Sequence, residues 1–257
     1  MNSAALAWHQ FRFDQRVFWR SPASVFFTVM LPILFLVMLA SIFGDERIAE
    51  LGGMRVSTYY VPGIMTLAVV SATMVSLAIS LTEARESGRL KRVRSTPLPV
   101  WAFVAGRIGN AIVVSLLMVV LVTAIGAVFY GVEVPDRTVP AIAVSLVVGA
   151  FAFSCLGFAL ATAIPSEDAA PAITNVTALP LYFLSGVFIP QNQIPDGILT
   201  FAGLFPIRHL FEALLAGFDP ATTGAGFEFG SLAVVAAWGL AGLAIAVFAF
   251  RWSPRGG

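Results

Sequence analysis

The chain alternates between long apolar runs and short polar segments, a pattern that predicts several crossings of a membrane. A helix that spans the hydrocarbon core of a bilayer needs about 20 mainly apolar residues. Six runs meet this requirement and are predicted to be membrane-spanning helices: 23–43, 59–82, 106–130, 140–164, 171–190 and 230–250. The predicted fold class is therefore an all-α integral membrane protein with six transmembrane helices.

The first 21 residues have an amphipathic pattern instead. Basic side chains follow one helical stripe: His9, Arg12, Arg16 and Arg20. Aromatic side chains cluster on another stripe: Trp8, Phe11, Phe18 and Trp19. A helix with two such faces is typical of a segment that lies in the membrane interface. We therefore divide the chain into an interfacial helix, residues 1–21, and a membrane domain, residues 22–254.

The segment after the fifth predicted span is apolar but interrupted. Gly203 and Pro206 break it into pieces that are each too short to cross a bilayer. This pattern predicts a re-entrant helical hairpin at about 194–218, on the outer side of the membrane. Arg208 and Glu212 are four residues apart, so we expect them to pair on the second helix, as a functional contact or as a weak surface ion pair.

Composition strengthens the membrane assignment. Hydrophobic residues make up 58% of the chain and charged residues 11%, and the mean hydropathy is +0.89. Soluble domains contain about 25% charged residues. A soluble fold of 257 residues is excluded because it could not bury this much apolar surface. The net charge of +1 indicates no partner by itself.

The distribution of the 15 cations predicts the orientation. With six spans and the N-terminus inside, four cations face outward and the remaining 11 face the cytoplasm. The outward cations are Arg47, Arg55, Arg137 and Arg208. Cytoplasmic loops of membrane proteins carry an excess of Lys and Arg. We therefore expect a multi-pass protein of the plasma membrane with both termini in the cytoplasm.

Between the second and third predicted spans, five cations fall within ten residues: Arg85, Arg89, Lys91, Arg92 and Arg94. On a helix, Arg85, Arg89 and Arg92 would share a face. Glu86 would reach Arg89 at a spacing of three residues. A short charged helix of this kind is a candidate docking element for a partner protein. It is equally suited to anchor the loop on anionic lipid.

The sequence contains no motif of an enzyme or of a nucleotide-binding domain. The patterns G-x-x-x-x-G-K-[ST], H-E-x-x-H and G-x-S-x-G are all absent. The one cysteine, Cys155, and the two histidines, His9 and His209, lack the spacing of a metal site. We therefore predict a chain that is not an enzyme and has no catalytic, cofactor or metal site.

No ionisable residue lies deep in any predicted span. Proton-driven carriers depend on such residues. We therefore expect the energy for transport to enter from a partner, with the cationic segment as its entry point. Two alternatives are kept: an ion-coupled secondary carrier, and a membrane scaffold that transports nothing.

Two segments resemble the type-2 ABC transporter permeases. The first, EARESGRLKRVRSTPLPVWAFVAGR at 83–107, is similar to the family's loop after the second span. Its matching residues are Glu83, Arg85, Glu86, Gly88, Leu90, Arg94, Thr96 and Pro97. The second, at 182–218, is similar to the end of the fifth span and the outer re-entrant hairpin. Its matching residues are Leu184, Ser185, Gly186, Pro190, Pro195, Pro206, Glu212 and Ala213. The chain looks most like daunorubicin-resistance-type and nodulation-type bacterial exporters.

The resemblance implies a dimer of permease subunits, identical or related, that works with a dimer of ATPase subunits. ATP and magnesium would bind to the ATPase, and this chain would bind no cofactor. Membrane lipid is a further expected partner, and nucleic acid is not. The implied function is export of a lipophilic, amphipathic or glycoconjugate cargo across the bacterial inner membrane, with drug efflux and antibiotic resistance as one role.

The resemblance also implies which residues act at three sites. The ATPase-coupling helix would contain Glu83, Arg85, Glu86, Gly88, Arg89, Leu90, Arg92 and Arg94. The exit hairpin would contain Pro190, Pro195, Pro206, Arg208 and Glu212. The interfacial helix, resting near the ATPase, would contribute Arg12, Arg16 and Arg20.

Overall fold

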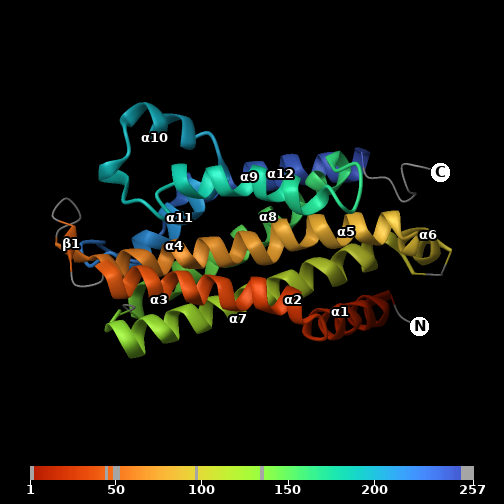
Figure 1. The fold of residues 1–257 in the computed structure, drawn as a ribbon, viewed down its shortest axis with the longest axis horizontal. Helices are drawn as coiled ribbons and strands as arrows, with labels where there is room; N and C mark the ends of the chain where they lie inside the picture. The colour runs from red at the N-terminus through yellow and green to blue at the C-terminus, as the bar shows by residue number, and fades with distance from the viewer. Residues whose placement is uncertain (1–2, 44–45, 49–52, 96–97, 134–135, 250–257) are drawn as a thin grey trace.

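The computed structural model describes these residues: 3–43, 46–48, 53–95, 98–133 and 136–249. Within them the chain is almost entirely helical, and the helices form one elongated bundle (Figure 1). One antiparallel ladder joins β1 (Arg47–Ile48) to β2 (Met54–Arg55). The predicted all-α fold class is confirmed.

The chain forms its elements in the following order. The first half contains α1 (Ser3–Trp19), α2 (Pro22–Val25), the π-helical η1 (Phe26–Met30), α3 (Leu31–Phe43), α4 (Val56–Val70), the π-helical η3 (Ser71–Val75), α5 (Ser76–Glu86) and α6 (Arg89–Arg94). The second half contains α7 (Val100–Tyr130), the 3-10 helix η4 (Asp136–Thr138), α8 (Val139–Ala163), α9 (Ala170–Leu184), the 3-10 helix η5 (Gln191–Gln193), α10 (Asp196–Ala202), α11 (Pro206–Phe218) and α12 (Phe229–Ala249). The elements α4, η3 and α5 follow one another without a break.

Four helical stretches are long and apolar enough to cross a membrane: Val56–Glu86, Trp101–Tyr130, Asp136–Ala163 and Phe229–Ala249. They correspond to the second, third, fourth and sixth predicted spans. The first and fifth predicted spans correspond to shorter apolar helices, Thr28–Phe43 and Ala170–Leu184. A protein with several membrane-capable helices is thus confirmed, whereas the count of six spans stays a prediction.

Two helix boundaries differ from the predicted ones. α9 ends at Leu184 rather than at Pro190, because Gly186 takes a φ of 84°, which a right-handed helix cannot continue. α7 begins earlier than predicted, at Val100, directly after Pro99 in an extended conformation. Both differences arise from turn residues, which hydrophobicity alone does not register.

The centre of the bundle is α4. Every residue from Tyr59 to Val70 is buried, as expected for a helix that is apolar on nearly all sides. α4 packs against α3, α7, α8 and α11. Gly63 permits one of its closest contacts, since a Cβ atom there would lie 2.7 Å from the carbonyl oxygen of Val187. The core is therefore built around the helix that leads, through η3 and α5, to the predicted coupling segment.

The candidate functional elements lie at the two ends of the bundle (Figure 1). One end carries α6, the start of α1 and the end of α12, and we call it the α6 end. The opposite end carries the β1–β2 ladder together with α10 and α11, and we call it the β1 end. The long helices connect these two ends.

Candidate functional site

The α6 end contains the segment that was predicted to couple an ATPase to the permease. α5 ends at Glu86, and the amide of Gly88 closes its last turn on the carbonyl of Arg85 at 3.0 Å. Gly88 then takes a φ of 68°, a left-handed conformation that glycine adopts without steric cost. α6 begins at the next residue, so the turn at Gly88 separates this short charged helix from α5.

The side chain of Arg85 is buried inside the bundle, with 1% of its surface exposed. Its Nη1 donates to the carbonyl of Ala161 at 2.8 Å, and its Nη2 donates to the carbonyl of Ile164 at 2.6 Å. Both carbonyls belong to the C-terminal end of α8, where helix carbonyls lack intrahelical partners and carry partial negative charge. Arg85 therefore fastens the end of α5 to the end of α8, an arrangement that we call the Arg85 clasp.

The predicted face shared by Arg85, Arg89 and Arg92 does not form. The turn at Gly88 separates Arg85 from the other two arginines, and Arg85 points into the bundle. The predicted contact between Glu86 and Arg89 is also wrong. Glu86 Oε1 instead accepts a hydrogen bond of 2.7 Å from Nε of Arg85. Arg85 and Glu86 thus belong to the internal framework of this end rather than to an exposed docking face.

Three cations of α6 are exposed and form what we call the α6 basic surface: Arg89, Lys91 and Arg92. Nη2 of Arg89 lies 3.9 Å from Oε2 of the exposed Glu83. Leu90 points the other way and is buried in an apolar cluster with side chains of α5 and α7. α6 therefore packs one face on the bundle and exposes a basic face. The side chain of Arg94 lies outside the described residues.

α1 packs against α7 near the same end of the bundle. The cations predicted for the N-terminal helix are all exposed: Arg12, Arg16 and Arg20. Asp14, which no sequence pattern indicated, is buried, with Oδ1 at 3.7 Å from Nε of Arg107 in α7. Nη1 of Arg107 also donates to Ser80 Oγ in α5 at 2.9 Å. Burial raises the pKa of Asp14 and outweighs the opposing effects of Arg107 and of a hydrogen bond from Gln10.

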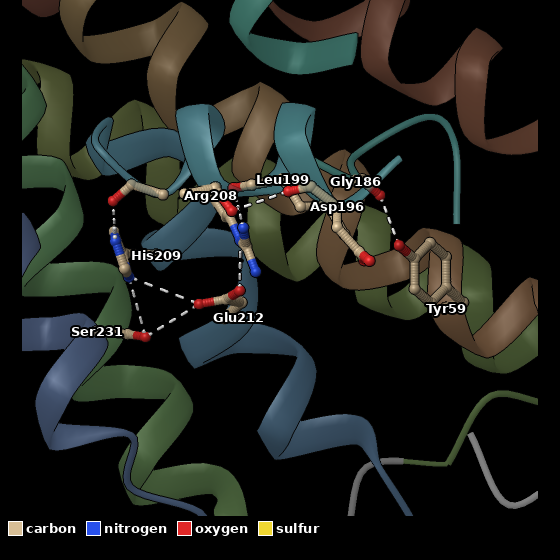
Figure 2. Close-up of polar contacts among 10 residues, drawn as sticks. Tyr59, Gly186, Asp196, Leu199, Arg208, His209, Glu212 and Ser231 are labelled. Atoms are coloured by element: carbon tan, nitrogen blue, oxygen red, sulfur yellow. Dashed lines mark hydrogen bonds and ion pairs between the residues drawn. The ribbon is translucent and has the colours of Figure 1, made fainter. Parts of the chain in front are cut away.

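At the β1 end, α10 and α11 meet at an angle of 100° and form the bent helix pair that was predicted as a re-entrant hairpin. Prolines stand at the starts of three helices here: Pro190 precedes η5, Pro195 precedes α10 and Pro206 opens α11. Proline suits these positions because the amide that it lacks would have no intrahelical partner. Nε of Arg208 donates to Glu212 Oε1 at 2.7 Å, which confirms the predicted pair (Figure 2).

A polar cluster surrounds this pair (Figure 2). Nη1 of Arg208 donates to the carbonyl of Leu199 in α10. Oε2 of Glu212 accepts from the hydroxyl of Ser231 in α12 at 3.3 Å and lies 3.5 Å from Nδ1 of His209. The other ring nitrogen of His209 lies 2.8 Å from a carbonyl in the turn between α10 and α11. This hairpin cluster, Arg208, His209, Glu212 and Ser231, connects α10, α11 and α12.

Two members of the hairpin cluster, His209 and Ser231, were not predicted from the sequence. His209 was weighed only as a metal ligand, although its spacing of three residues from Glu212 was a usable signal. Ser231 lies 19 residues from Glu212, in a different helix, and no local pattern indicates their contact. Among the residues that the structure describes, no group of three His, Cys, Asp or Glu side chains is placed to hold a metal ion.

A cavity of about 500 Å³ opens at the β1 end, beside Pro190. Its lining is partly apolar, with Phe43 at the end of α3 and Phe188 after α9. Polar groups also line it, among them Glu46 and Tyr60. Cavities of roughly 300 to 1,000 Å³ accept small organic molecules, and a mixed lining suits a molecule with an apolar and a polar part.

The chain is similar to membrane permeases of two bacteria. The sequence pattern of the family described as ABC-2 type transporter matches residues 4–218. Inner membrane transport permease YadH of Escherichia coli (strain K12) is 25% identical over 194 residues, which cover 74% of this chain and 75% of YadH. Probable multidrug ABC transporter permease YbhR of the same strain is 24% identical over 156 residues, which cover 60% of this chain and 42% of YbhR. Putative transport permease YvfS of Bacillus subtilis (strain 168) is 21% identical over 194 residues, which cover 74% of this chain and 76% of YvfS.

Proposed function

Because the chain belongs to the ABC-2 type transporter family, we propose that it is the permease subunit of an ATP-driven exporter. It spans the bacterial inner membrane, dimerises with a second permease copy, identical or related, and binds a dimer of ATPase subunits. ATP and magnesium bind to those ATPase subunits, and the permease itself hydrolyses nothing. Energy reaches the cargo pathway only through contacts between the two kinds of subunit.

The observation that carries this proposal is the α6 basic surface and its connection to the core. A helical run of 31 residues, Val56–Glu86, leads from the β1 end to the turn before α6. A displacement of the exposed Arg89 and Arg92 would be transmitted to this helical run through the short turn at Gly88. The same displacement would be transmitted to α8 through the Arg85 clasp, whose hydrogen bonds measure 2.6 and 2.8 Å. The α6 basic surface is thus mechanically joined to two long helices.

ATP can drive this movement only if it binds one arrangement of the complex better than another. In the proposed mechanism, ATP closes the ATPase pair and displaces α6. α5 and α8 then tilt together because the Arg85 clasp holds their ends. Tilting of the helices in both permease copies opens a route between the copies, and the cargo leaves past the hairpin cluster.

We place the α6 end in the cytoplasm, and with it both termini. This end carries the cations Arg85, Arg89, Lys91, Arg92 and Arg107 together with those of the N-terminal helix. The β1 end carries the cations Arg47, Arg55, Arg137 and Arg208. An excess of cations is the usual mark of the cytoplasmic side.

We propose a lipophilic, amphipathic or glycoconjugate cargo. The mixed lining of the cavity beside Pro190 suits a molecule with one apolar and one polar part. The printed name of YbhR describes that relative as a probable multidrug permease, which supports drug efflux as one role. The Pro190–Pro206 region and the hairpin cluster form the proposed exit.

Charge reversal on the α6 basic surface tests the proposed function. We expect Arg89→Glu/Arg92→Glu to reach the membrane in normal amount but to lose at least about tenfold in efflux of a lipophilic fluorescent dye, because contacts to the ATPase become repulsive. ATP turnover by the reconstituted complex should no longer respond to the dye. The matched control, Arg55→Glu/Arg137→Glu, reverses two exposed cations at the β1 end and should export normally.

Three results would contradict the proposal. Normal efflux by the α6 variant at normal membrane abundance would exclude coupling through this surface. Transport that resists vanadate and stops when the ion gradient collapses would identify an ion-coupled carrier. A chain that copurifies with no ATPase, and whose deletion leaves export unchanged, would be a scaffold.

A further inference from the structure

The acidic and the basic side chains of α1 lie on different faces of the helix. Its acid, Asp14, is 7% exposed and points toward Arg107 in α7. Its cations Arg12 and Arg16, like Arg20 just after the helix, are exposed on the other side. None of these three cations forms an ion pair with a residue that the structure describes. The exposed face of α1 is therefore strongly basic, with no acid of its own beside it.

A cleft of about 140 Å³ lies within this basic face. It is lined by His9, Arg12, Phe13 and Arg16, which follow one another at helical spacings of three, one and three residues. One water molecule occupies about 30 Å³ in the liquid, so the cleft has room for a group of phosphate size. Two guanidinium groups at its edge suit such a group, because their planar forks match pairs of phosphate oxygens.

Three large aromatic side chains on or next to α1 are exposed, and one of them, Phe13, lines the cleft. Trp8 is 60% exposed, Phe13 56% and Trp19 48%. Tryptophan and other aromatic side chains settle at the headgroup level of a membrane, where one part is apolar and another is wet. α2 begins at Pro22, close after the cleft, and opens the first long apolar run. The cleft therefore lies just before the start of this apolar run.

We propose that the cleft formed by His9, Arg12, Phe13 and Arg16 binds the phosphate of an anionic phospholipid in the membrane leaflet beside α1. A lipid meets both features of this surface at once, because its phosphate neutralises the two arginines and its apolar part covers the aromatic rings. Free phosphate would satisfy only the cations. This inference does not depend on the cargo or on ATP coupling.

Lipid titration of the purified full-length chain tests the proposal. Native mass spectrometry in a mild detergent would count bound molecules of phosphatidylglycerol, of phosphatidylcholine and of inorganic phosphate. We expect one tightly held phosphatidylglycerol for each chain, little phosphatidylcholine and little phosphate. Arg12→Gln/Arg16→Gln should weaken phosphatidylglycerol binding about twenty-five-fold, since each cation near an anionic lipid contributes roughly fivefold. Thermal unfolding of the same samples checks that the variant is folded.

Two further variants separate a built cleft from general charge attraction. Arg55→Gln/Arg137→Gln removes the same charge from exposed positions at the β1 end and should leave the tight lipid bound. Phe13→Ala leaves every charge in place and should still weaken binding severalfold, because it removes one wall of the cleft. Loss of lipid in the first control, or no loss in Phe13→Ala, would overturn the assignment of a defined site.

Other results would identify a different ligand for the cleft. Equal binding of phosphatidylcholine would exclude selection of an anionic headgroup. Displacement of the lipid by millimolar inorganic phosphate, one for one, would make the cleft a site for a free anion. If Arg12→Gln/Arg16→Gln keeps its lipid but no longer copurifies with the ATPase, the basic face is a protein contact and the lipid proposal fails.

Discussion

Two arginine–glutamate pairs with the same contact distance lie at opposite ends of the bundle. In each pair the arginine Nε is 2.7 Å from a glutamate Oε1: Arg85 with Glu86, and Arg208 with Glu212. In each pair the same guanidinium also donates to a backbone carbonyl of another helix. The carbonyls that Arg85 reaches are 76 and 79 residues away along the chain, whereas the one that Arg208 reaches is 9 residues away.

The comparison shows that one chemical pair can have two structural roles. Arg85, with 1% of its side chain exposed, joins the ends of two long helices that are distant in sequence. Arg208, with 20% exposed, supports a bend between neighbouring helices, and His209 and Ser231 support the same bend. The clasp at the α6 end thus holds elements together across the fold, whereas the hairpin cluster shapes one local segment.

Removing each guanidinium should give the largest difference between the two ends. Arg85→Gln should lower the free energy of unfolding by about 3 kcal/mol, because it leaves buried groups without their charged partner. Arg208→Gln should cost about 1 kcal/mol, since water and the remaining cluster can replace the lost bonds. Unfolding midpoints in detergent would measure both. Equal losses of unfolding free energy would show that the two arginines contribute equally to stability.

A conservative variant sharpens this first test. Arg85→Lys keeps the positive charge but cannot present two parallel donors to two carbonyls. We expect its stability to lie between wild type and Arg85→Gln, while efflux falls toward the level of Arg85→Gln. If efflux instead decreases in parallel with stability from wild type through Arg85→Lys to Arg85→Gln, the clasp supports the fold without transmitting movement.

The second largest effect should come from the turn that separates Arg85 from α6. Gly88→Ala should cost about 1 to 2 kcal/mol, because alanine is strained at a φ of 68° although no atom lies within 4 Å of the new Cβ. Gly197→Ala, in α10, adds the same methyl group with equal room but without a positive φ. It should leave stability unchanged or raise it by up to about 1 kcal/mol. Unfolding midpoints and efflux of both variants check this contrast between the ends.

The predictability of the two pairs differs for a physical reason. Arg208 and Glu212 are four residues apart on one helix, so spacing alone predicts their contact. The burial of Arg85 depends on carbonyls at the end of α8. Every residue has a backbone carbonyl, so the sequence does not indicate which carbonyls will accept these hydrogen bonds. Gly88 did carry a signal, since a glycine after a charged helix end often stops the helix.

The membrane-spanning helices differ in predictability for a similar physical reason. Long apolar runs determine the helices of Val56–Glu86 and Phe229–Ala249, because a run of this length has no alternative fold in lipid. The end of α9 at Leu184 depends on the turn at Gly186, which hydrophobicity does not register. Neither apolar runs nor turn residues predict contacts between polar residues that are distant in sequence, such as Asp14 with Arg107.

The smallest expected effect concerns a third arginine–acid pair, Asp14 with Arg107, which resembles neither of the first two. Its atoms are 3.7 Å apart, and the buried Nε of Arg107 has no hydrogen-bond partner among the described residues. Burial raises the pKa of Asp14 above its ordinary value of 3.8, so the folded protein binds this proton more readily than the unfolded chain does. Wild type should therefore gain stability relative to Asp14→Asn as the pH falls from neutral toward 3.8.

Unfolding midpoints of wild type and Asp14→Asn, measured side by side at several pH values, would show the sign of this effect. The asparagine variant has no group that titrates at this position, so it subtracts the behaviour of all other groups. If wild type instead loses stability relative to the variant as the pH falls, attraction to Arg107 outweighs the cost of burial. Asp14 and Arg107 would then hold α1 on α7 by charge, as Arg85 and Arg208 hold their helices, rather than by packing alone.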